Sequence, residues 1–411
     1  MTKYKNTQKE SGEEVSARQH LTLAWVLGSL SAFGPLATDM YLPAFPKMRL
    51  EFATEPGRVQ LTLAVFLLGL AFGQLLWGTW SDRTGRRLPL LVGFGLFVVT
   101  SACCALATSV EWLILARFLM GIGGSAGQVV SRAIARDLFE AREAARFYSL
   151  MMIVSGIAPI VGPFLGNLVL AYGGWRLIFG LLAGLGVACW LLVWRAVPET
   201  LLLEEAASSH LSALFRGYSN VLRNKYFLSL TLALGCMFGV LFSYISSSPF
   251  VFKLYGVAEE YFGILFAVNG IGLYLGGQSN ARLLRRFSET RLLRCGAFVN
   301  LVAMLLLILC VCLGQGSLVV FFVLLFISLS SLSFIFPNAT ALAMRPFALE
   351  AGSASATLGI FQFFVGALGG ALAGVWGSET ALPVVIQIAL FAFAGNFLIL
   401  FLTRKSPVHV A

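Results

Sequence analysis

The sequence predicts an all-α membrane protein whose twelve transmembrane helices form two pseudo-symmetric bundles of six. The chain of 411 residues is 58% hydrophobic and only 12% charged, and its mean hydropathy is +0.85. Soluble domains carry about 25% charged residues, so most of this surface must face lipid. Apolar runs long enough to cross a bilayer recur along the chain, and the two halves share a repeated segment.

Twelve runs meet the requirement of about 20 apolar residues for a spanning helix. Short turns rich in Arg, Glu, Gly and Pro separate them. The first run follows a polar, charged stretch, residues 1–20, unlike the short basic start of a cleavable signal, so we expect it to remain as the first span. The predicted spans are Leu21–Phe45, Val59–Thr79, Leu88–Thr108, Trp112–Ser131, Phe147–Leu170, Leu177–Val197, Tyr226–Phe252, Tyr261–Ser279, Leu292–Leu313, Leu318–Ala341, Ser353–Trp376 and Leu382–Thr403.

The longest connection, residues 198–225, is polar and divides the spans into six plus six. The second span ends in Gly78-Thr-Trp-Ser-Asp82-Arg83, and the eighth ends in Gly276-Gly-Gln-Ser-Asn280-Ala-Arg282, about half a chain length later. Such a repeat is typical of transporters built from two related bundles around a central cavity. The predicted organisation is an N-tail (1–20), a first bundle (21–197), a central loop (198–225), a second bundle (226–403) and a C-tail (404–411).

The net charge of +10 reflects where the basic residues lie. Most of the 29 Lys and Arg residues fall in the two tails and in the loops that follow the even-numbered spans. The positive-inside rule then places both termini in the cytoplasm of a multi-pass protein of the bacterial inner membrane. The bilayer is therefore the expected partner, and nucleic acid is not.

Soluble-enzyme signatures are missing from the sequence. It contains no GxxxxGK[ST] phosphate loop, no HExxH and no CxxC, so we expect neither an enzyme nor a metal site, and no use of ATP. The seven cysteines lie in or beside apolar runs and are interpreted as packing residues. His20, His210 and His409 lie outside the spans, which argues against a histidine proton relay.

Two charged residues fall inside spans, Asp39 in the first and Arg117 in the fourth. A charge within a bilayer costs a few kcal/mol at the least and marks a functional site by default. At about 1.5 Å per residue both lie on the same side of the midplane, at depths of about 9 and 6 Å. The alternative is an ion pair that only ties the two helices together, or an Arg117 that extends to the interface.

The loop after the second span reads Gly78-x-x-Ser81-Asp82-Arg83-x-Gly85-Arg86-Arg87. It is interpreted as a latch, because an Asp can accept hydrogen bonds from free backbone N–H groups at a helix N-terminus while arginines seek carboxylates. Asp137 is available to Arg83 or Arg86. The alternative is a solvated basic turn that obeys only the positive-inside rule. The loop resembles the signature loop of the major facilitator superfamily, and the resemblance implies that its partner is the N-terminus of the eleventh span, near Gly352 and Ser353.

The fifth span carries Gly156-x-x-Pro159-x-x-Gly162-Pro163-x-x-Gly166. Glycines at this spacing open one helix face to close approach, and prolines bend the helix. The pattern resembles the antiporter motif of drug:proton antiporters in the superfamily. Ordinary small-residue helix packing is the alternative.

Of two further segments, one resembles a motif of antiporters and the other resembles the bicyclomycin and chloramphenicol resistance (Bcr/CflA) branch. Arg117-Phe-Leu-Met-Gly-Ile-Gly123 is similar to the arginine motif linked to proton transfer, and Ala37-Thr-Asp39-Met-Tyr41-Leu-Pro43-Ala-Phe-Pro46 is similar to the branch's first-span signature. The resemblance implies that Asp39 carries the proton and that Arg117 assists it. We find no second acid in the first span, a position that some broad-range relatives use for cationic drugs.

Polar and aromatic residues in other spans are candidates for the substrate cavity. Each one alone is equally consistent with an interhelical hydrogen bond or with packing. The candidates are Tyr41, Phe66, Gln128, Tyr244, Asn269, Asn338, Phe361 and Gln362.

From these features we expect a monomeric, proton-driven exporter of small, largely apolar molecules that works by alternating access and needs no cofactor besides the proton gradient. The first alternative is an exporter of one endogenous metabolite, such as a siderophore, an amino-acid derivative or a nucleoside. The second alternative is a receptor or channel. It is disfavoured because such a protein needs neither the internal duplication nor the glycine–proline face of the fifth span.

Overall fold

The computed structural model describes residues 26–138, 141–200, 218–313, 317–347, 351–375 and 380–402. In these ranges every regular element is a helix, short turns connect the helices, and no strand is present. Nine of the helices in the described part are long and apolar enough to cross a membrane. The prediction of an all-α membrane fold is confirmed.

The first helix spans residues 26–39 and is followed by two short elements before the next long helix. The elements after it are η1 (Leu42–Ala44), α2 (Phe45–Glu51), α3 (Pro56–Thr84), α4 (Arg87–Ala105), α5 (Val110–Leu138), α6 (Ala141–Ala196), α9 (Lys225–Leu254), α10 (Glu259–Leu283), α11 (Glu289–Cys312), α12 (Leu318–Met344), α13 (Ala351–Val375) and α14 (Leu382–Leu402).

The long α6 contains two spans joined at a break. Gly174 has φ 72° and ψ −177°, a conformation that interrupts the helix and that glycine adopts without strain. The break separates the two predicted spans that end at Leu170 and begin at Leu177. With it, the described helices supply all twelve predicted spans.

The first span ends earlier than predicted. We expected it to reach Phe45, but the α-helix stops at Asp39 and the chain continues through η1 into α2. Pro43 and Pro46 lie at the starts of these two short elements. Proline lacks the N–H that a continuing helix needs, so the apolar run remains buried although the long helix has ended.

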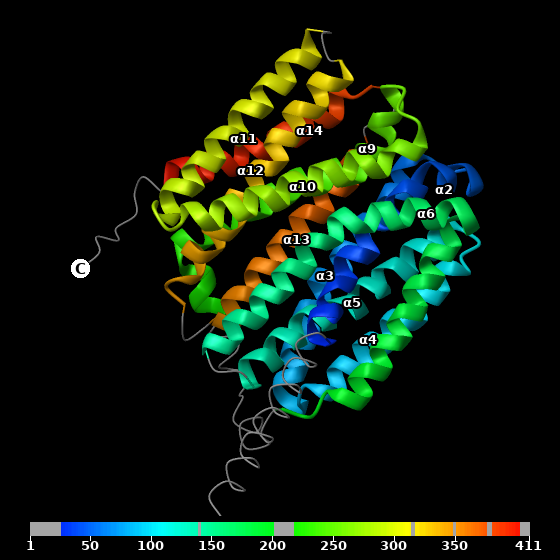
Figure 1. Cartoon of the computed structure of the whole chain (residues 1–411), viewed down its shortest axis with the longest axis vertical. Coiled ribbons are helices and arrows are strands. Elements are labelled where there is room, and N and C mark those ends of the chain that lie inside the picture. The colour runs from blue at the N-terminus through cyan, green and yellow to red at the C-terminus, as the bar shows by residue number, and fades with distance from the viewer. Residues whose placement is uncertain are drawn as a thin grey trace, which may run out of the picture.

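The helices up to α6 gather on one side of the molecule and those from α9 onward on the other (Figure 1). Across this division α3 packs on α13, and α6 packs on α10. Glycines allow the close approach: a Cβ on Gly57 of α3 would lie 2.4 Å from the carbonyl oxygen of Gly374 in α13. In lipid, where no hydrophobic force draws helices together, such van der Waals contact is the main source of association.

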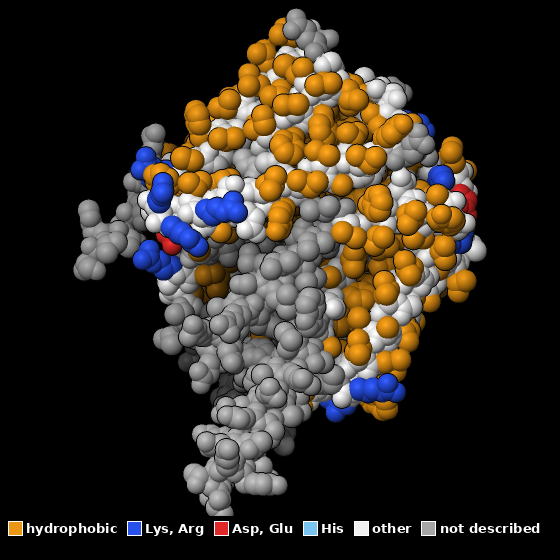
Figure 2. Space-filling view, in the orientation of Figure 1, with side chains coloured by type: hydrophobic (Ala, Val, Ile, Leu, Met, Phe, Trp, Pro, Cys, Tyr) orange, Lys and Arg blue, Asp and Glu red, His pale blue; other side chains and the backbone are white. Residues whose placement is uncertain are grey.

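Hydrophobic side chains cover most of the visible face, and lysines and arginines lie near the edges of the molecule (Figure 2). Large apolar residues such as Leu106, Phe164 and Phe397 are more than half exposed. An apolar outer surface with charged ends is the arrangement that a bilayer requires. We call the end with η1 and α2 the η1 end and the end with Asp82 and Asp137 the latch end.

Candidate functional site

Asp39 is the last residue of the first helix and is buried, with a side chain only 3% exposed. Its position follows from the local sequence, because the helix ends just before Pro43. Within the described part of the chain its carboxylate forms no ion pair and no hydrogen bond. Burial disfavours the charged form of any unpaired carboxyl group, so this residue is suited to bind a proton.

Two glycines of the antiporter motif lie directly against Asp39 and Met40, at the end of the first helix. A Cβ on Gly162 would be 3.0 Å from the Asp39 Cβ, and a Cβ on Gly166 would be 1.8 Å from the carbonyl oxygen of Met40. Any side chain at these two positions would push α6 away from the first helix. The motif therefore sets the distance between α6 and the only carboxyl group that the sequence places inside a span.

Gly156 and Pro159, the first two members of this motif, lie in the part of α6 whose side chains fall outside the described set. Pro163 is buried, and its carbonyl oxygen lies 3.3 Å from the position of a Cβ on Gly263 in α10. The described part of the motif thus touches the first helix and, at Pro163, the second half of the chain.

Arg117 of α5 is completely buried in an aromatic cage. Its guanidinium carbon lies 4.0 Å from the ring centroid of Phe66, 4.2 Å from that of Tyr41 and 5.7 Å from that of Phe179. A desolvated cation–π contact contributes about 2 kcal/mol or more. Nη1 lies 3.4 Å from the Met120 sulfur, while Nε and Nη2 have no hydrogen-bond partner among the described residues.

The ion pair between Asp39 and Arg117 that the sequence allowed is not formed in this arrangement. The extension of Arg117 to the interface is not seen either, because the guanidinium is enclosed by rings from α3, α6 and the turn before η1. Tyr41, two residues after Asp39, contacts the Arg117 guanidinium with its ring. Its hydroxyl is 3.2 Å from Thr62 Oγ1 in α3, which fixes the ring in this place.

Tyr244 and Asn269 form a polar pair in the second half of the chain. Asn269 Nδ2 donates to the Tyr244 hydroxyl at 2.8 Å and to the Leu265 carbonyl at 3.3 Å. The Tyr244 ring stacks on Phe266, with 5.6 Å between centroids. The hydrogen bond between them therefore joins α9 to α10 within the second half of the chain.

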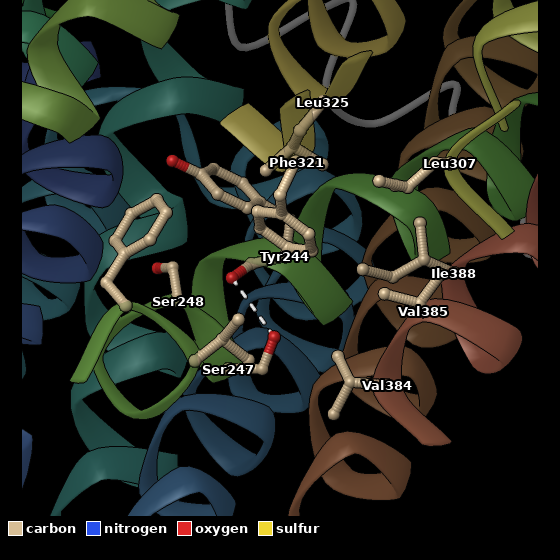
Figure 3. Close-up of a pocket in the computed structure, with 11 residues that line it drawn as sticks. Tyr244, Ser247, Ser248, Leu307, Phe321, Leu325, Val384, Val385 and Ile388 are labelled. Atoms are coloured by element: carbon tan, nitrogen blue, oxygen red, sulfur yellow. Dashed lines mark hydrogen bonds between the residues drawn. The ribbon is translucent and has the colours of Figure 1, made fainter. Parts of the chain in front are cut away.

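Tyr244 also borders a narrow cavity inside the second half, between α9, α11, α12 and α14. The cavity walls are mostly apolar, with Leu307, Val385 and Ile388 on one side, and the Tyr244 hydroxyl points away from them (Figure 3). The Tyr244 ring thus lines this apolar cavity, while its hydroxyl is bonded to Asn269.

The remaining cavity candidates occupy different places. Gln128 lies against the first helix, since a Cβ on Gly34 would be 2.9 Å from its Nε2. Asn338 donates to Asn280 Oδ1 at 2.7 Å and so joins α12 to α10 within one half. Phe361 and Gln362 of α13 are half-buried. Among these four, Asn338 is accounted for by an interhelical hydrogen bond.

The loop between α3 and α4 is organised around Arg86, whose side chain is 2% exposed. Its guanidinium donates to Asp82 Oδ1 at 2.5 Å, to Asp137 Oδ2 at 2.8 Å and to Ser81 Oγ at 3.2 Å. Burial alone would lower the pKa of Arg86, but the hydrogen bonds and charges of Asp137 and Asp82 outweigh it and the pKa is raised. The expected pairing of Arg86 with Asp137 is therefore present. Gly78 lies in α3, where an added Cβ would be 3.7 Å from Val129 Cγ1 of α5.

Glu199 completes this loop and was not among the predicted site residues. Its carboxylate accepts from the backbone N–H groups of Arg86 at 2.7 Å and Arg87 at 3.1 Å. Gly85 has φ 94°, and a Cβ there would lie 2.4 Å from Glu199 Oε2. Only glycine therefore lets the carboxylate reach the N-terminus of α4, where a negative charge is favourable.

The expected contact between Asp82 and the start of α13 is not seen. In the described ranges, which omit residues 348–350, the Asp82 carboxylate bonds to Arg86 and not to the backbone of Gly352 or Ser353. Arg83 forms no ion pair in the same ranges. Arg87 donates instead to the Trp194 carbonyl at 2.5 Å. All of these contacts lie within the first half.

The two halves meet at the η1 end. The Phe45 and Phe250 ring centroids are 6.3 Å apart, and η1 packs against α9 and α10. Beside this contact, Trp175 Nε1 donates to Glu51 Oε2 at 2.6 Å, and Arg176 pairs with the other Glu51 oxygen. Partial burial raises the pKa of Glu51, but these donors and the Arg176 charge lower it below the usual value.

Comparison with known proteins agrees with these features. The sequence profile of the Major Facilitator Superfamily matches residues 27–374. The chain is 35% identical to the uncharacterized MFS-type transporter YdgK of Bacillus subtilis, over 95% of this chain and 97% of that protein. It is 31% identical to the multidrug transporter MdfA of Yersinia pestis, over 95% of each chain. It is 29% identical to the bicyclomycin resistance protein homolog of Haemophilus influenzae, over 92% of this chain and 96% of that protein.

Among solved structures, the xylose transporter XylE of E. coli superposes with a TM-score of 0.76, covering 95% of this chain and 98% of that chain at 14% identity. At this identity the likeness concerns the fold alone. The fold, the loop around Arg86 and the sequence relatives identify a transporter and not an enzyme. The chain belongs to the Major Facilitator Superfamily, in its drug:proton antiporter branch.

Proposed function

We propose that this protein exports small, largely apolar molecules across the bacterial inner membrane in exchange for protons. One observation carries the proposal: Asp39 is a buried carboxyl group with no ion-pair partner among the described residues, and it lies against Gly162 of the antiporter motif. A carboxyl group in this setting gains and loses a proton at a cost that its surroundings control.

The latch end is assigned to the cytoplasm and the η1 end to the periplasm. The latch end carries Arg83, Arg86 and Arg87, in keeping with the positive-inside rule. With this orientation both termini are cytoplasmic, and the contact between Phe45 and Phe250 lies on the periplasmic side. The cycle requires a second conformation in which this contact opens.

The two bundles, residues 21–197 and 226–403, would rock about the central cavity. Asp39 takes a proton from the periplasm and releases it to the cytoplasm, and substrate and proton favour conformers that open to opposite sides. A proton moving through about 150 mV supplies roughly 3.5 kcal/mol. That free energy sustains a substrate concentration ratio of a few hundred.

Arg117 is proposed to tune this step from its aromatic cage. Its Nε and Nη2 groups, which have no partner among the described residues, remain available to donate to a carboxylate in another conformation. The latch, made of Gly78, Asp82, Arg83, Gly85, Arg86, Arg87 and Asp137, is proposed to set the balance between conformers. Glu199 is added to it here because it binds the same backbone.

The proposed substrate class is supported by the names of the relatives and by the aromatic residues around the charged site. Two of the relatives are named for multidrug transport and bicyclomycin resistance, and aromatic rings such as Phe66 surround the charged site. The alternative is an exporter of one endogenous metabolite, such as a siderophore, an amino-acid derivative or a nucleoside. We propose that the protein acts as a monomer, with the bilayer, its substrate and protons as its only partners.

Transport into proteoliposomes tests the proposal. The purified chain would be reconstituted and given a panel of chemically diverse compounds with and without an imposed pH difference. Accumulation of several unrelated apolar compounds, dependent on the pH difference, is expected. Accumulation of one metabolite alone would favour the alternative, and equal movement without a pH difference would contradict proton coupling.

A further inference from the structure

The aromatic cage of Arg117 is built from separate elements of the first half. Tyr41 comes from the turn before η1, Phe66 from α3 and Phe179 from α6. Arg117 itself belongs to α5. The Tyr41 and Phe179 ring centroids are 5.6 Å apart. The cage therefore stays closed only while these elements keep their places relative to one another.

A group of side chains at the η1 end fastens three of these elements together. Glu51 ends α2, in the segment that carries Tyr41, and its carboxylate accepts from Trp175 Nε1 at 2.6 Å. Arg176 donates to the other carboxylate oxygen and, through Nη2, to the Ala107 carbonyl at 2.9 Å. Ala107 lies in the connection that leads into α5, and Trp175 and Arg176 lie in α6. We call Glu51, Trp175 and Arg176 the clamp.

The clamp also touches the cage. The Trp175 ring meets the Phe179 ring edge to face, with 6.0 Å between centroids and 87° between planes. Trp175 also packs on Phe52, the residue after Glu51, with centroids 5.4 Å apart. The Phe179 centroid in turn lies 5.7 Å from the Arg117 guanidinium carbon. A continuous series of contacts thus runs from a half-exposed carboxylate at the η1 end to the buried guanidinium.

The clamp differs from an ordinary surface ion pair. Trp175 is 3% exposed, so without Glu51 its indole N–H would lose its acceptor in a largely buried place, which is costly. The Arg176 guanidinium also lies 4.2 Å from the Trp175 ring centroid, so it is held by a carboxylate, a carbonyl and a ring. The pair of Arg58 and Glu111 at the same end joins two exposed side chains by one hydrogen bond, and such pairs contribute little.

We propose that the clamp keeps the cage closed around Arg117, so that Glu51 is a positioning residue for the buried cation. Without Glu51, α2 and α6 separate at the η1 end, and the Tyr41 and Phe179 rings part. The guanidinium then loses the ring contacts that fix it and becomes accessible to water. The link from the cage to transport rests on the proposed proton antiport, whereas the closure of the cage does not.

All contacts of the clamp lie within the first half of the chain, between residues 51 and 176. Movement of the two halves against each other does not break them. The clamp is therefore able to hold the guanidinium in one place while the carrier changes the side to which it opens. Its loss is expected to impair the step in which Arg117 takes part and to leave the latch end unchanged.

The test measures how fast phenylglyoxal, which reacts with accessible guanidinium groups, labels Arg117 in the purified full chain in detergent. Mass spectrometry of the peptides gives the rate at each arginine. Glu51→Ala removes the acceptor for both donors of the clamp. We expect its Arg117 labelling to be about tenfold faster than in the parent, the change expected when hydrogen bonds to a charged group are lost. Glu111→Ala, which removes the ion pair with Arg58 at the same end, should label as the parent does.

Arg86 separates an opened cage from a loosened protein. It is nearly as buried as Arg117 but lies at the latch end, so it should stay protected in Glu51→Ala. Parental labelling of Arg117 in this variant would overturn the inference. If Arg86 is exposed as well, Trp175→Phe, which keeps an aromatic ring and removes the N–H, decides by the same two arginines. Exposure of both again would mean that the clamp supports the whole fold, and it would overturn the inference too.

Transport by the same variants tests the link to function. The probe is the panel compound that the parent accumulates most strongly in proteoliposomes with an imposed pH difference. Its accumulation should be about tenfold slower in Glu51→Ala and unchanged in Glu111→Ala. A parental rate in Glu51→Ala with Arg117 exposed would overturn the positioning role. A parent that accumulates no panel compound would instead contradict the proposed function, and the labelling rates would still decide whether the clamp closes the cage.

Discussion

Gly166 of α6 lies so close to Met40 that a Cβ on the glycine would be 1.8 Å from the Met40 carbonyl oxygen. One turn earlier, a Cβ on Gly162 would be 3.0 Å from the Asp39 Cβ. The two glycines therefore hold the end of the first helix at a fixed distance from α6, and they do so at the residue that we propose to carry the proton.

Alanine at these two glycines should have unequal effects. Gly166→Ala forces backbone apart and should destabilise the protein by about 1–3 kcal/mol or more, seen as a lower unfolding temperature in detergent. Gly162→Ala needs a shift of only a few tenths of an ångström, so it should fold and bind substrate but transport more slowly. Gly180→Ala, whose Cβ would meet nothing within 4 Å, is the control. Equal stability of all three would show that the close approach at Gly166 is not required.

The twelve spans were predictable because lipid imposes long apolar runs that a one-dimensional pattern records. The end of the first span was not, because residues 40–45, after the helix has ended, are as apolar as the helix before them. Pro43 and Pro46 were visible in the sequence, and they mark the change in backbone. A hydropathy pattern reports burial but does not distinguish one continuous helix from a helix followed by two buried turns.

Which residues form the site could be predicted from the sequence, but most of their contacts could not. Asp39 and Arg117 stood out as charges inside spans, but sequence does not show that aromatic rings, not Asp39, surround Arg117. Glu199 was missed because it lies in a polar connection where carboxylates are ordinary, and only the fold brings it to the N-terminus of α4. Its one signal is the glycine at position 85, which leaves room for a partner.

Arg117 is expected to act through its charge. Arg117→Met keeps an apolar side chain among the rings and removes a cation whose Nε and Nη2 lack hydrogen bonds among the described residues, so stability should be equal or higher. Proton-driven transport should nevertheless be lost. Arg117→Lys should retain part of it, because a compact ammonium cannot cover two rings at once. Transport assays and thermal unfolding check this, and equal transport by Arg, Lys and Met would exclude a role for the charge.

Glu199→Gln should slow turnover without abolishing binding. The amide keeps one acceptor for the two backbone donors and loses the charge at the start of α4, a change of about 0.5–2 kcal/mol. Transport rate and substrate affinity, measured separately, check this expectation. Glu111→Gln removes an exposed pair with Arg58 at the opposite end and should have little effect. Parental turnover in Glu199→Gln would remove this residue from the latch.

The two acids that hold Arg86 should differ in importance. Asp137 is 14% exposed and Asp82 is 37% exposed, so loss of charge at Asp137 leaves Arg86 less well satisfied. Asp82→Asn should give slower turnover with near-normal binding and a more open cytoplasmic side, and Asp137→Asn should show the same change to a larger degree. Cysteine accessibility from each side of the membrane measures it. Unchanged labelling together with lost binding would mean that this loop is not a latch.

Proton-driven accumulation by Asp39→Asn tests the central claim most directly. Asparagine has nearly the same size and cannot exchange a proton, so the variant should fold, bind substrate and move it only down its own gradient. In proteoliposomes with an imposed pH difference we expect the parent to accumulate substrate and Asp39→Asn to reach no more than equal concentrations on the two sides. Accumulation by Asp39→Asn against a substrate gradient would contradict the account, because the proton would then travel through another group.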